Sequence, residues 1–243
     1  MTFPSLDHNP VVVVGEGLQV GPWVAIGEES GRSGVNPAGT LGPHAHLRRG
    51  TIIYAGSRIG AYFETGHYVI VREECEIGDH VSVWSHSVID YGVRIGNDVS
   101  LHTGIYIAQY TTIEDEVFIA PGVKFANDPH PVCSRCMMGP TIKRGARLGV
   151  GVVVNGGITV GEGALIGSGS VVTRDIPAGV VAVGNPARVL GPVTELPCPY
   201  GLTPYEVQGG HYLDVRAQGF DRSRSDSLQG PPKRPAKQPG ADE

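Results

Sequence analysis

The feature that most constrains this chain is an apolar side chain that returns at every sixth residue. From Leu41 to Phe125, fourteen of the fifteen positions in this step are apolar, and Thr65 is the exception. The same step runs from Val14 to Ile26 and from Ile142 to Val172. A period of six fits neither an α-helix nor a simple alternating strand. It is typical of a parallel β-helix, in which each hexapeptide forms one short strand and one corner.

The residues between these apolar positions favour the same fold. Three residues after the apolar position, where the chain must turn, the sequence has Gly at 50, 56, 92, 104, 122, 145, 151, 157, 163 and 169, and Asp at 98 and 175. Glycine, and to a lesser degree Asp, tolerates the backbone angles of a tight corner at low cost. Two patterns in register therefore predict an all-β protein built on one repeat.

Two polar segments, residues 28–40 and 126–141, interrupt the repeat. They divide it into three, fifteen and six units, which makes eight triangular coils if three units form one coil. Because each break follows a multiple of three, both insertions should leave the prism at the same edge, five coils or roughly 24 Å apart. We expect a β-helix domain over residues 1–193, with Val180 to Leu190 covering its end. Residues 194–243 should be an irregular extension, disordered after about Arg222.

Composition excludes several functions. The net charge is −5, and the basic residues form no stripe, which argues against a nucleic-acid partner. No apolar run is long enough to span a membrane. The first ten residues lack the plan of a secretory signal, and the four cysteines form no disulfide framework, so we expect a cytoplasmic protein.

Three segments carry a resemblance to a known family. They are residues 126–132 (ANDPHPV), 166–177 (IGSGSVVTRDIP) and 183–189 (VGNPARV). With the repeat, they resemble the hexapeptide-repeat acyltransferases. The resemblance implies a left-handed parallel β-helix, a homotrimer, and acetyl-CoA bound in a groove between subunits. Residues 66–128 are most similar to acetyltransferases that modify amino groups of nucleotide-linked sugars.

His130 is the predicted catalytic residue. It lies between Pro129 and Pro131 on the longer insertion, and the His-Pro pair resembles the family's catalytic histidine. An imidazole titrates near neutral pH, so it suits removal of a proton from an attacking amine or hydroxyl. The alternative is an ordinary histidine on a surface loop.

Substrate contacts are predicted in the middle coils. Trp84, His86 and His102 should lie on one face, beneath the insertion if that loop folds back, and the position of His102 roughly matches a substrate-contacting residue of related sugar acetyltransferases. Packing between subunits is the alternative role for these three. Weaker candidates for hydrogen bonds to the substrate are Gln109, Asn127 and Asp128.

The cofactor contacts follow from stacking and from the resemblance. Val150 and Ser168 are eighteen residues apart, so they should occupy the same site on successive coils and bind the pantetheine arm of acetyl-CoA. The Gly151 amide could stabilise the thioester oxygen. Thr173, Arg174 and Arg188 lie near the end of the helix, where the family holds the phosphates of coenzyme A. A solvated basic end is the alternative for the two arginines.

A metal site is an alternative use of the longer insertion. Cys133 and Cys136 form a CxxC pair three residues after His130, and Cys198 lies further along the chain. Thiolates and imidazole are ordinary zinc ligands, and a zinc ion here would take His130 away from catalysis. The histidine spacing does not match the zinc carbonic anhydrases of the same fold.

The leading hypothesis is an acetyl-CoA-dependent N-acetyltransferase that acts on a nucleotide-linked amino sugar without a metal. An O-acetyltransferase, a non-catalytic β-helix scaffold and a zinc-binding protein remain alternatives.

Overall fold

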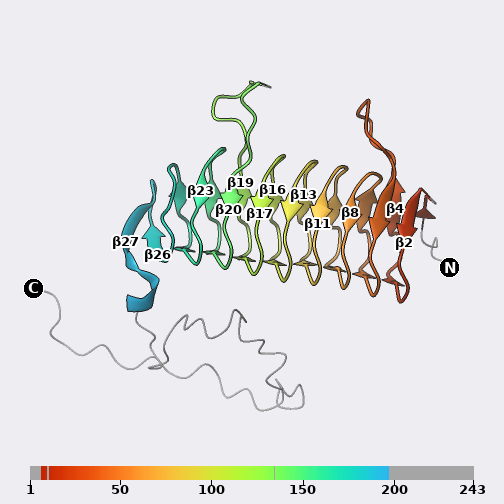
Figure 1. Ribbon diagram of the computed structural model, residues 1–243, viewed down its shortest axis with the longest axis horizontal. Coiled ribbons are helices and arrows are strands. Elements are labelled where there is room, and N and C mark those ends of the chain that lie inside the picture. Colours follow the sequence, from red (N-terminus) through yellow and green to blue (C-terminus); the bar gives the residue numbers. More distant parts are fainter. Residues whose placement is uncertain (1–6, 10, 134, 197–243) are drawn as a thin grey trace, which may run out of the picture. The chain divides into compact units, whose positions relative to one another are not determined.

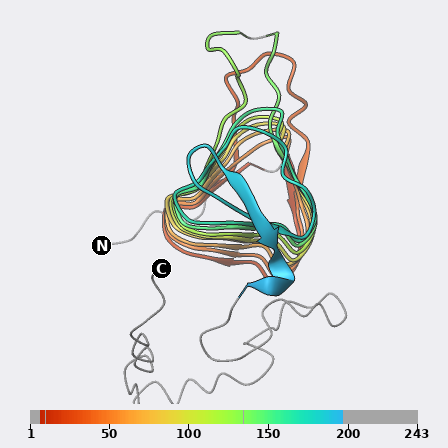
Figure 2. The ribbon, with the colours of Figure 1, turned by 90° about the vertical axis from the view of Figure 1, so that its left-hand side faces the viewer.

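The computed structural model describes residues 7–9, 11–133 and 135–196, which form a three-sided parallel β-helix (Figures 1 and 2). Each side of this prism is one sheet, named here A, B or C, and the chain visits them in the order B, C, A. The β-helix belongs to a compact unit, Met1–Glu195. No described helix is long and apolar enough to cross a membrane. Residues 197–243, which include most of the predicted irregular extension and Cys198, lie outside the described residues.

The strands are short, and most contain two residues. Sheet A contains β1 (Asp7–His8), β4 (Ala25–Glu28), β7 (Ile52–Tyr54), β10 (Ile70–Val71), β13 (Val88–Ile89), β16 (Tyr106–Ile107), β19 (Lys124–Phe125), β22 (Val153–Val154) and β25 (Val171–Val172). Sheet B contains β2 (Val12–Val14), β5 (Gly39–Leu41), β8 (Arg58–Ile59), β11 (Glu76–Ile77), β14 (Arg94–Ile95), β17 (Thr112–Ile113), β20 (Thr141–Ile142) and β23 (Thr159–Val160). Sheet C contains β3 (Gln19–Val20), β6 (His46–Leu47), β9 (Glu64–Thr65), β12 (Ser82–Val83), β15 (Ser100–Leu101), β18 (Phe118–Ile119), β21 (Arg147–Leu148), β24 (Leu165–Ile166), β26 (Val180–Val183) and β27 (Arg188–Pro192).

The apolar position of each repeat points into the prism, as predicted. Where no insertion intervenes, partners on neighbouring coils are eighteen residues apart, for example Ile89 against Val71 and Ile107. Thr65 fits the core because its hydroxyl lies 2.8 Å from that of Thr51, and both side chains are fully buried. The repeat fails only at its beginning: Val20 is 40% exposed, because β3 is the terminal strand of sheet C.

The corners adopt the left-handed backbone conformation whether or not they contain glycine. Ten non-glycine residues have φ between 56° and 62°, each three residues after an inward-facing position of the repeat: Trp23, His44, Tyr62, Tyr68, Glu74, His80, His86, Asp98, Tyr110 and Glu116. The stacked strands therefore impose the conformation, at a local cost of about 1 kcal/mol where a side chain is present. At the predicted corner Asp175, the carboxylate instead accepts the Thr159 N–H (2.8 Å).

The two insertions leave the prism at the same edge. One follows β4 and the other follows β19, both in sheet A and five coils apart, and both project to the same side in Figures 1 and 2. This confirms the prediction from the phase of the breaks. At the other end, β26 pairs in parallel with β24, and β27 folds back antiparallel on β26 before the short 3-10 helix η1 (Val193–Glu195). The predicted cap over Val180 to Leu190 is therefore confirmed.

Candidate active site

All the predicted site residues except Arg188 fall on two edges of the prism. The C–A edge is formed by the corners between sheets C and A, and the A–B edge by the corners between sheets A and B. The C–A edge carries Trp84, His86, His102, Val150, Gly151 and Ser168. The A–B edge carries Gln109, Asn127, Asp128, His130, Thr173 and Arg174. The insertion extends outward (Figure 2), so one chain does not bring His130 over His102.

Aromatic and imidazole rings line the middle of the C–A edge. His86 stacks on Tyr68 with ring centroids 5.5 Å apart, and the Arg48 guanidinium lies 5.4 Å from the Trp84 ring. One coil further, the half-buried ring of His102 packs against Phe118 at 5.0 Å. These rings offer flat surfaces to a ligand that carries rings of its own.

Burial favours the neutral form of the His102 imidazole. Burial lowers the pKa of its imidazole below the ordinary value of 6.5, because the apolar surroundings disfavour the charged ring. A neutral imidazole at pH 7 can accept a proton. His102 therefore has the protonation state that a general base needs.

The predicted cofactor residues lie on the same edge, toward the C-terminal end. Val150 is 54% exposed, its N–H donates to Ser168 Oγ (3.1 Å), and its carbonyl accepts the Gly169 N–H (2.8 Å). The Gly151 N–H donates to the Pro121 carbonyl (2.9 Å). This bond between coils already uses the Gly151 amide, which argues against its predicted role as donor to the thioester oxygen. Gly151 itself has φ 67°, and no atom lies within 4 Å of the place that a Cβ would take, so the main chain is open to a ligand there.

The residues predicted to hold the phosphates are spread over the end of the prism. Thr173 and Arg174 follow β25 on the A–B edge, and Arg188 begins β27. All three are exposed, and the Arg188 guanidinium donates to the Ala187 carbonyl (2.8 Å). The structure thus places these residues near the same end as Val150, but on other faces.

A hydrogen-bonded chain lies at the base of the longer insertion. The nearly buried Asp90 carboxylate accepts hydrogen bonds from Tyr106 Oη (2.8 Å) and Gln109 Nε2 (2.6 Å). Gln109 Oε1 in turn accepts a hydrogen bond from Asn127 Nδ2 (2.5 Å). Burial and the bond to Asp90 raise the pKa of Tyr106 to about 12, so its hydroxyl keeps its proton. The network orients Asn127 where the insertion leaves the prism.

Sequence reasoning missed an acidic cluster on this edge. Glu73 is fully buried. Its carboxylate forms ion pairs with Arg72 Nε (2.9 Å) and with Arg32 Nη1 (3.3 Å), and Arg32 comes from the first insertion. Burial alone would raise the pKa of the Glu73 carboxyl, but hydrogen bonds from Arg72, its own backbone, Ser30 and Arg32 hold it at about 2. One sequence signal could have indicated this cluster. Arg72 and Asp90 are eighteen residues apart, so opposite charges stack on neighbouring coils at this edge.

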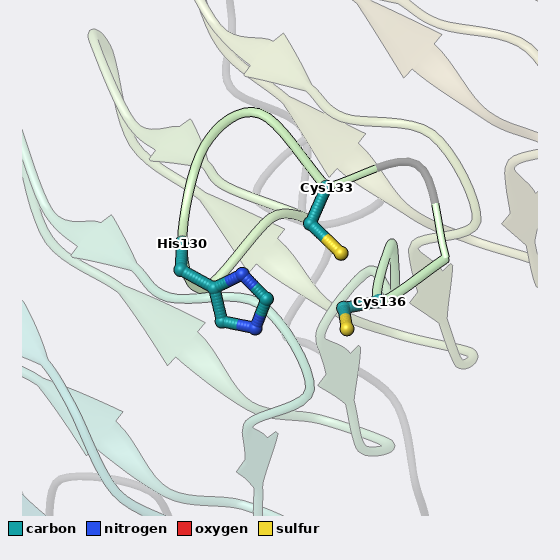
Figure 3. Close-up of side chains that lie close together, drawn as sticks. All are labelled: His130, Cys133 and Cys136. Carbon is teal, nitrogen blue, oxygen red and sulfur yellow. The ribbon is translucent and has the colours of Figure 1, made fainter.

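At the tip of the longer insertion, His130 lies beside two thiols (Figure 3). The nearest ligand atoms of His130, Cys133 and Cys136 all lie within 4.8 Å of one another. The Asp128 carboxylate accepts hydrogen bonds from the backbone N–H groups of His130 (3.0 Å) and Cys133 (2.7 Å), so it is engaged within the loop.

A groove of about 670 Å³ runs along sheet B and contains none of the predicted site residues. Its walls are paired charges, with Glu76 contacting Arg58 (2.5 Å) and Arg94 (3.4 Å). The charges on this face are thus largely paired with one another.

Comparisons with known proteins agree with this fold. The family profile described as "Hexapeptide repeat of succinyl-transferase" matches residues 69–109 and 141–174. Galactoside O-acetyltransferase of Escherichia coli (strain K12) is 31% identical over 178 residues, which cover 68% of this chain and 88% of that enzyme. Serine acetyltransferase 1 (chloroplastic) of Arabidopsis thaliana is 42% identical over 108 residues, or 41% of this chain and 32% of the relative.

A solved structure extends the match to the architecture. The UDP-N-acetylglucosamine O-acyltransferase of Moraxella catarrhalis superposes with a TM-score of 0.57 at 21% identity, over 78% of this chain and 73% of that one. This likeness concerns the fold alone, and it identifies the prism as a left-handed parallel β-helix.

Proposed function

The chain belongs to the hexapeptide-repeat acyltransferase family, and we propose that it transfers the acetyl group of acetyl-CoA to an amino group of a nucleotide-linked sugar. Its relatives are acetyltransferases, and one of them, similar over most of its length, is named for a sugar acceptor. The narrower choice of acceptor rests on the resemblance of residues 66–128 to nucleotide-sugar N-acetyltransferases. With acetyl-CoA as the donor, we place the reaction in the cytoplasm.

The observation that carries this proposal is the composition of the C–A edge. Rings that can stack on a base or a sugar, at Trp84, His86 and His102, lie on the same edge as the exposed corner at Val150. His102 and Gly149 occupy the same corner position two coils apart, or roughly 10 Å along the axis. Acceptor and thioester could therefore lie end to end along one edge, which would hold the reacting groups close together.

His102 is our choice for the general base. It is half-buried and neutral, and it shares an edge with the cofactor corner, whereas His130 is exposed and lies beside two thiols. In the reaction, the amine nitrogen attacks the thioester carbonyl carbon, and the C–S bond breaks. His102 takes the proton from the nitrogen and returns it to the departing sulfur, so the products are an amide and free coenzyme A. His130 as the base stays a prediction.

The second edge enters the site through assembly. In the homotrimer that the family resemblance implies, the A–B edge of one subunit would face the C–A edge of the next. Asn127, held by Gln109, would then contact the acceptor from the neighbouring subunit. Substrate contacts at Gln109, Asn127 and Asp128 would in that case come from a different chain than those at His102.

The test is acetyl-CoA consumption with a panel of acceptors, followed by release of free thiol. Nucleotide-linked amino sugars should be acetylated, and the matched nucleotide sugars that carry a hydroxyl at the same carbon should not. Turnover of the hydroxyl compounds alone would establish the O-acetyltransferase alternative. No thiol release above the hydrolysis rate with any acceptor would leave the scaffold alternative.

A further inference from the structure

The tip of the longer insertion carries a cluster that the proposed transfer reaction does not use. His130 and Cys136 are exposed, Cys133 is half-buried, and their ligand atoms lie within 4.8 Å of one another. Figure 3 shows the imidazole and the two cysteine side chains lying close together at the tip of the loop. Three side chains that meet in this way on a loop require a physical reason.

The separations are close to those of a metal site. With zinc bonds of about 2.3 Å to sulfur and 2.0–2.1 Å to nitrogen, tetrahedral geometry puts ligand atoms about 3.5–3.8 Å apart. The observed limit of 4.8 Å exceeds this by only about 1 Å. A shift of about 1 Å in the ligand atoms would bring them to the separations of a zinc site.

The backbone already arranges the ligands. The Asp128 carboxylate accepts hydrogen bonds from the backbone N–H groups of His130 and Cys133, and these two bonds fix the turn between them. The Cys136 N–H donates to the Cys133 carbonyl (3.2 Å), which closes a second turn between the two thiols. The scaffold that positions the ligands is therefore formed by hydrogen bonds of the loop itself.

Apolar packing does not explain the order of this tip. Val132, in the centre of the cluster's sequence, is 99% exposed, and Met138 is 61% exposed. A loop with so little buried apolar surface needs another source of stability. A metal ion that joins three side chains would supply it.

The ligand set selects the metal. Two thiolates and one neutral imidazole are typical of zinc, whereas calcium and magnesium prefer oxygen ligands. The complex would be neutral, since two thiolate charges balance a divalent ion. A disulfide would account for the two cysteines but not for the imidazole beside them.

We propose that His130, Cys133 and Cys136 bind one zinc ion that fixes the tip of the 126–141 insertion, with water in the fourth position. The site is separate from the C–A edge, so it stands whether or not His102 acts as the base. It would make His130 a structural ligand.

The test is the zinc content of untagged protein purified under reducing conditions, compared with the Cys133→Ser/Cys136→Ser double variant. We expect about one zinc per chain in the natural protein, and at least a tenfold lower content in the double variant. His67→Ala removes an exposed histidine of the prism and should leave the zinc content unchanged. Cobalt substitution should give thiolate charge-transfer absorption in the natural protein and none in the double variant.

Two results would overturn the proposal. One is a natural protein without zinc even after incubation with the metal, or with the same zinc content as the double variant. The other is a disulfide between Cys133 and Cys136 that survives purification under reducing conditions and is detected by peptide mass. Acetyl transfer is measured separately, so a metal-free but active enzyme would reject the zinc site and leave the proposed function intact.

Discussion

The C–A edge and the A–B edge are built on the same hexapeptide, but they present different chemistry. Every described corner of the C–A edge has the same length, so its side chains stand in columns, with Trp84 directly beside His102 on the next coil. The A–B edge is interrupted twice, and each insertion needs anchors of its own. An unbroken edge therefore gives a regular track for a long ligand, and an interrupted edge gives loops that can reach a neighbouring chain.

The two insertions of the A–B edge are anchored differently. In the first, Arg32 reaches the prism, where it contacts Glu73 (3.3 Å) and Glu74 (2.9 Å) and lies 3.7 Å over the Tyr91 ring. In the second, the base is held by Asn127 and Gln109, and the tip by Asp128. The first loop is thus fixed by charge against the prism, whereas the second is fixed at its base by an amide–amide hydrogen bond to the prism and at its tip by its own turns.

The largest expected effect tests the C–A edge. Replacing His102 by Asn should lower kcat by about 10²–10⁴-fold, because a general base contributes that much, while the thermal unfolding temperature changes little. The matched control is His80→Asn, an exposed corner histidine on the third edge, which should keep full activity. If His130→Asn lost activity to that extent and His102→Asn did not, the base would be His130.

The same base predicts a pH profile. Because burial lowers the pKa of His102, kcat/KM should fall on the acid side with a midpoint below 6.5, the ordinary value for histidine. Activity is lost on the acid side because the protonated ring of His102 cannot accept the proton of the amine. An acid limb at or above that value would contradict the assignment.

Mixing two variants asks whether the edges of different subunits meet. His102→Asn disables the C–A edge, and Asn127→Ala should disable the A–B edge. If the chains form the proposed trimer, random mixing makes roughly a quarter of the sites combine two intact edges from different chains, so activity should return to about that fraction. Absence of recovery in mixed trimers would place both edges of one site on the same chain.

A stability effect of intermediate size tests the anchor of the first insertion. Glu73→Gln should lower the free energy of unfolding by about 2 kcal/mol at pH 7, because two arginines lose a buried charged acceptor. The folded pKa of about 2 lies below the ordinary value of 4.5, so the carboxylate stabilises the fold above pH 4.5, and that contribution is lost as the pH falls toward 2.

The natural protein and Glu73→Gln should therefore converge in acid, which denaturant unfolding at several pH values will measure. Glu74→Gln is the control, since this partly exposed residue shares Arg32 and should cost less than about 0.5 kcal/mol. A difference between the natural protein and Glu73→Gln that persists at pH 2 would contradict the ionic explanation.

The smallest effect concerns the base of the second insertion. Tyr106→Phe removes the hydroxyl that donates to Asp90 and should cost about 1 kcal/mol in unfolding free energy. Activity should fall modestly, since Asn127 is still held by Gln109. A loss of activity as large as that of Asn127→Ala would show that Tyr106 acts directly in the site.

The apolar period was enough to predict the prism, its eight coils, the common edge of the two insertions and the cap at the C-terminal end. It could do so because three hexapeptides make one coil, so the period of six decides which side chains point inside the prism. Residues eighteen apart then lie on neighbouring coils, one strand spacing from each other. The same regularity placed Val150 beside Ser168 and Trp84 beside His102.

The surroundings of the outward residues, and the edge that each shares with others, emerged only from the folded chain. Sequence reasoning grouped His130 with His102, but the insertion leaves from a different edge, and its direction depends on Asp128 and other contacts within the loop. The buried Glu73 is paired not only with the neighbouring Arg72 but also with Arg32, from an insertion some forty residues away, and the Gly151 amide is bonded to the carbonyl of Pro121. Such contacts follow from where chain segments meet in space, and an apolar period carries no information about them.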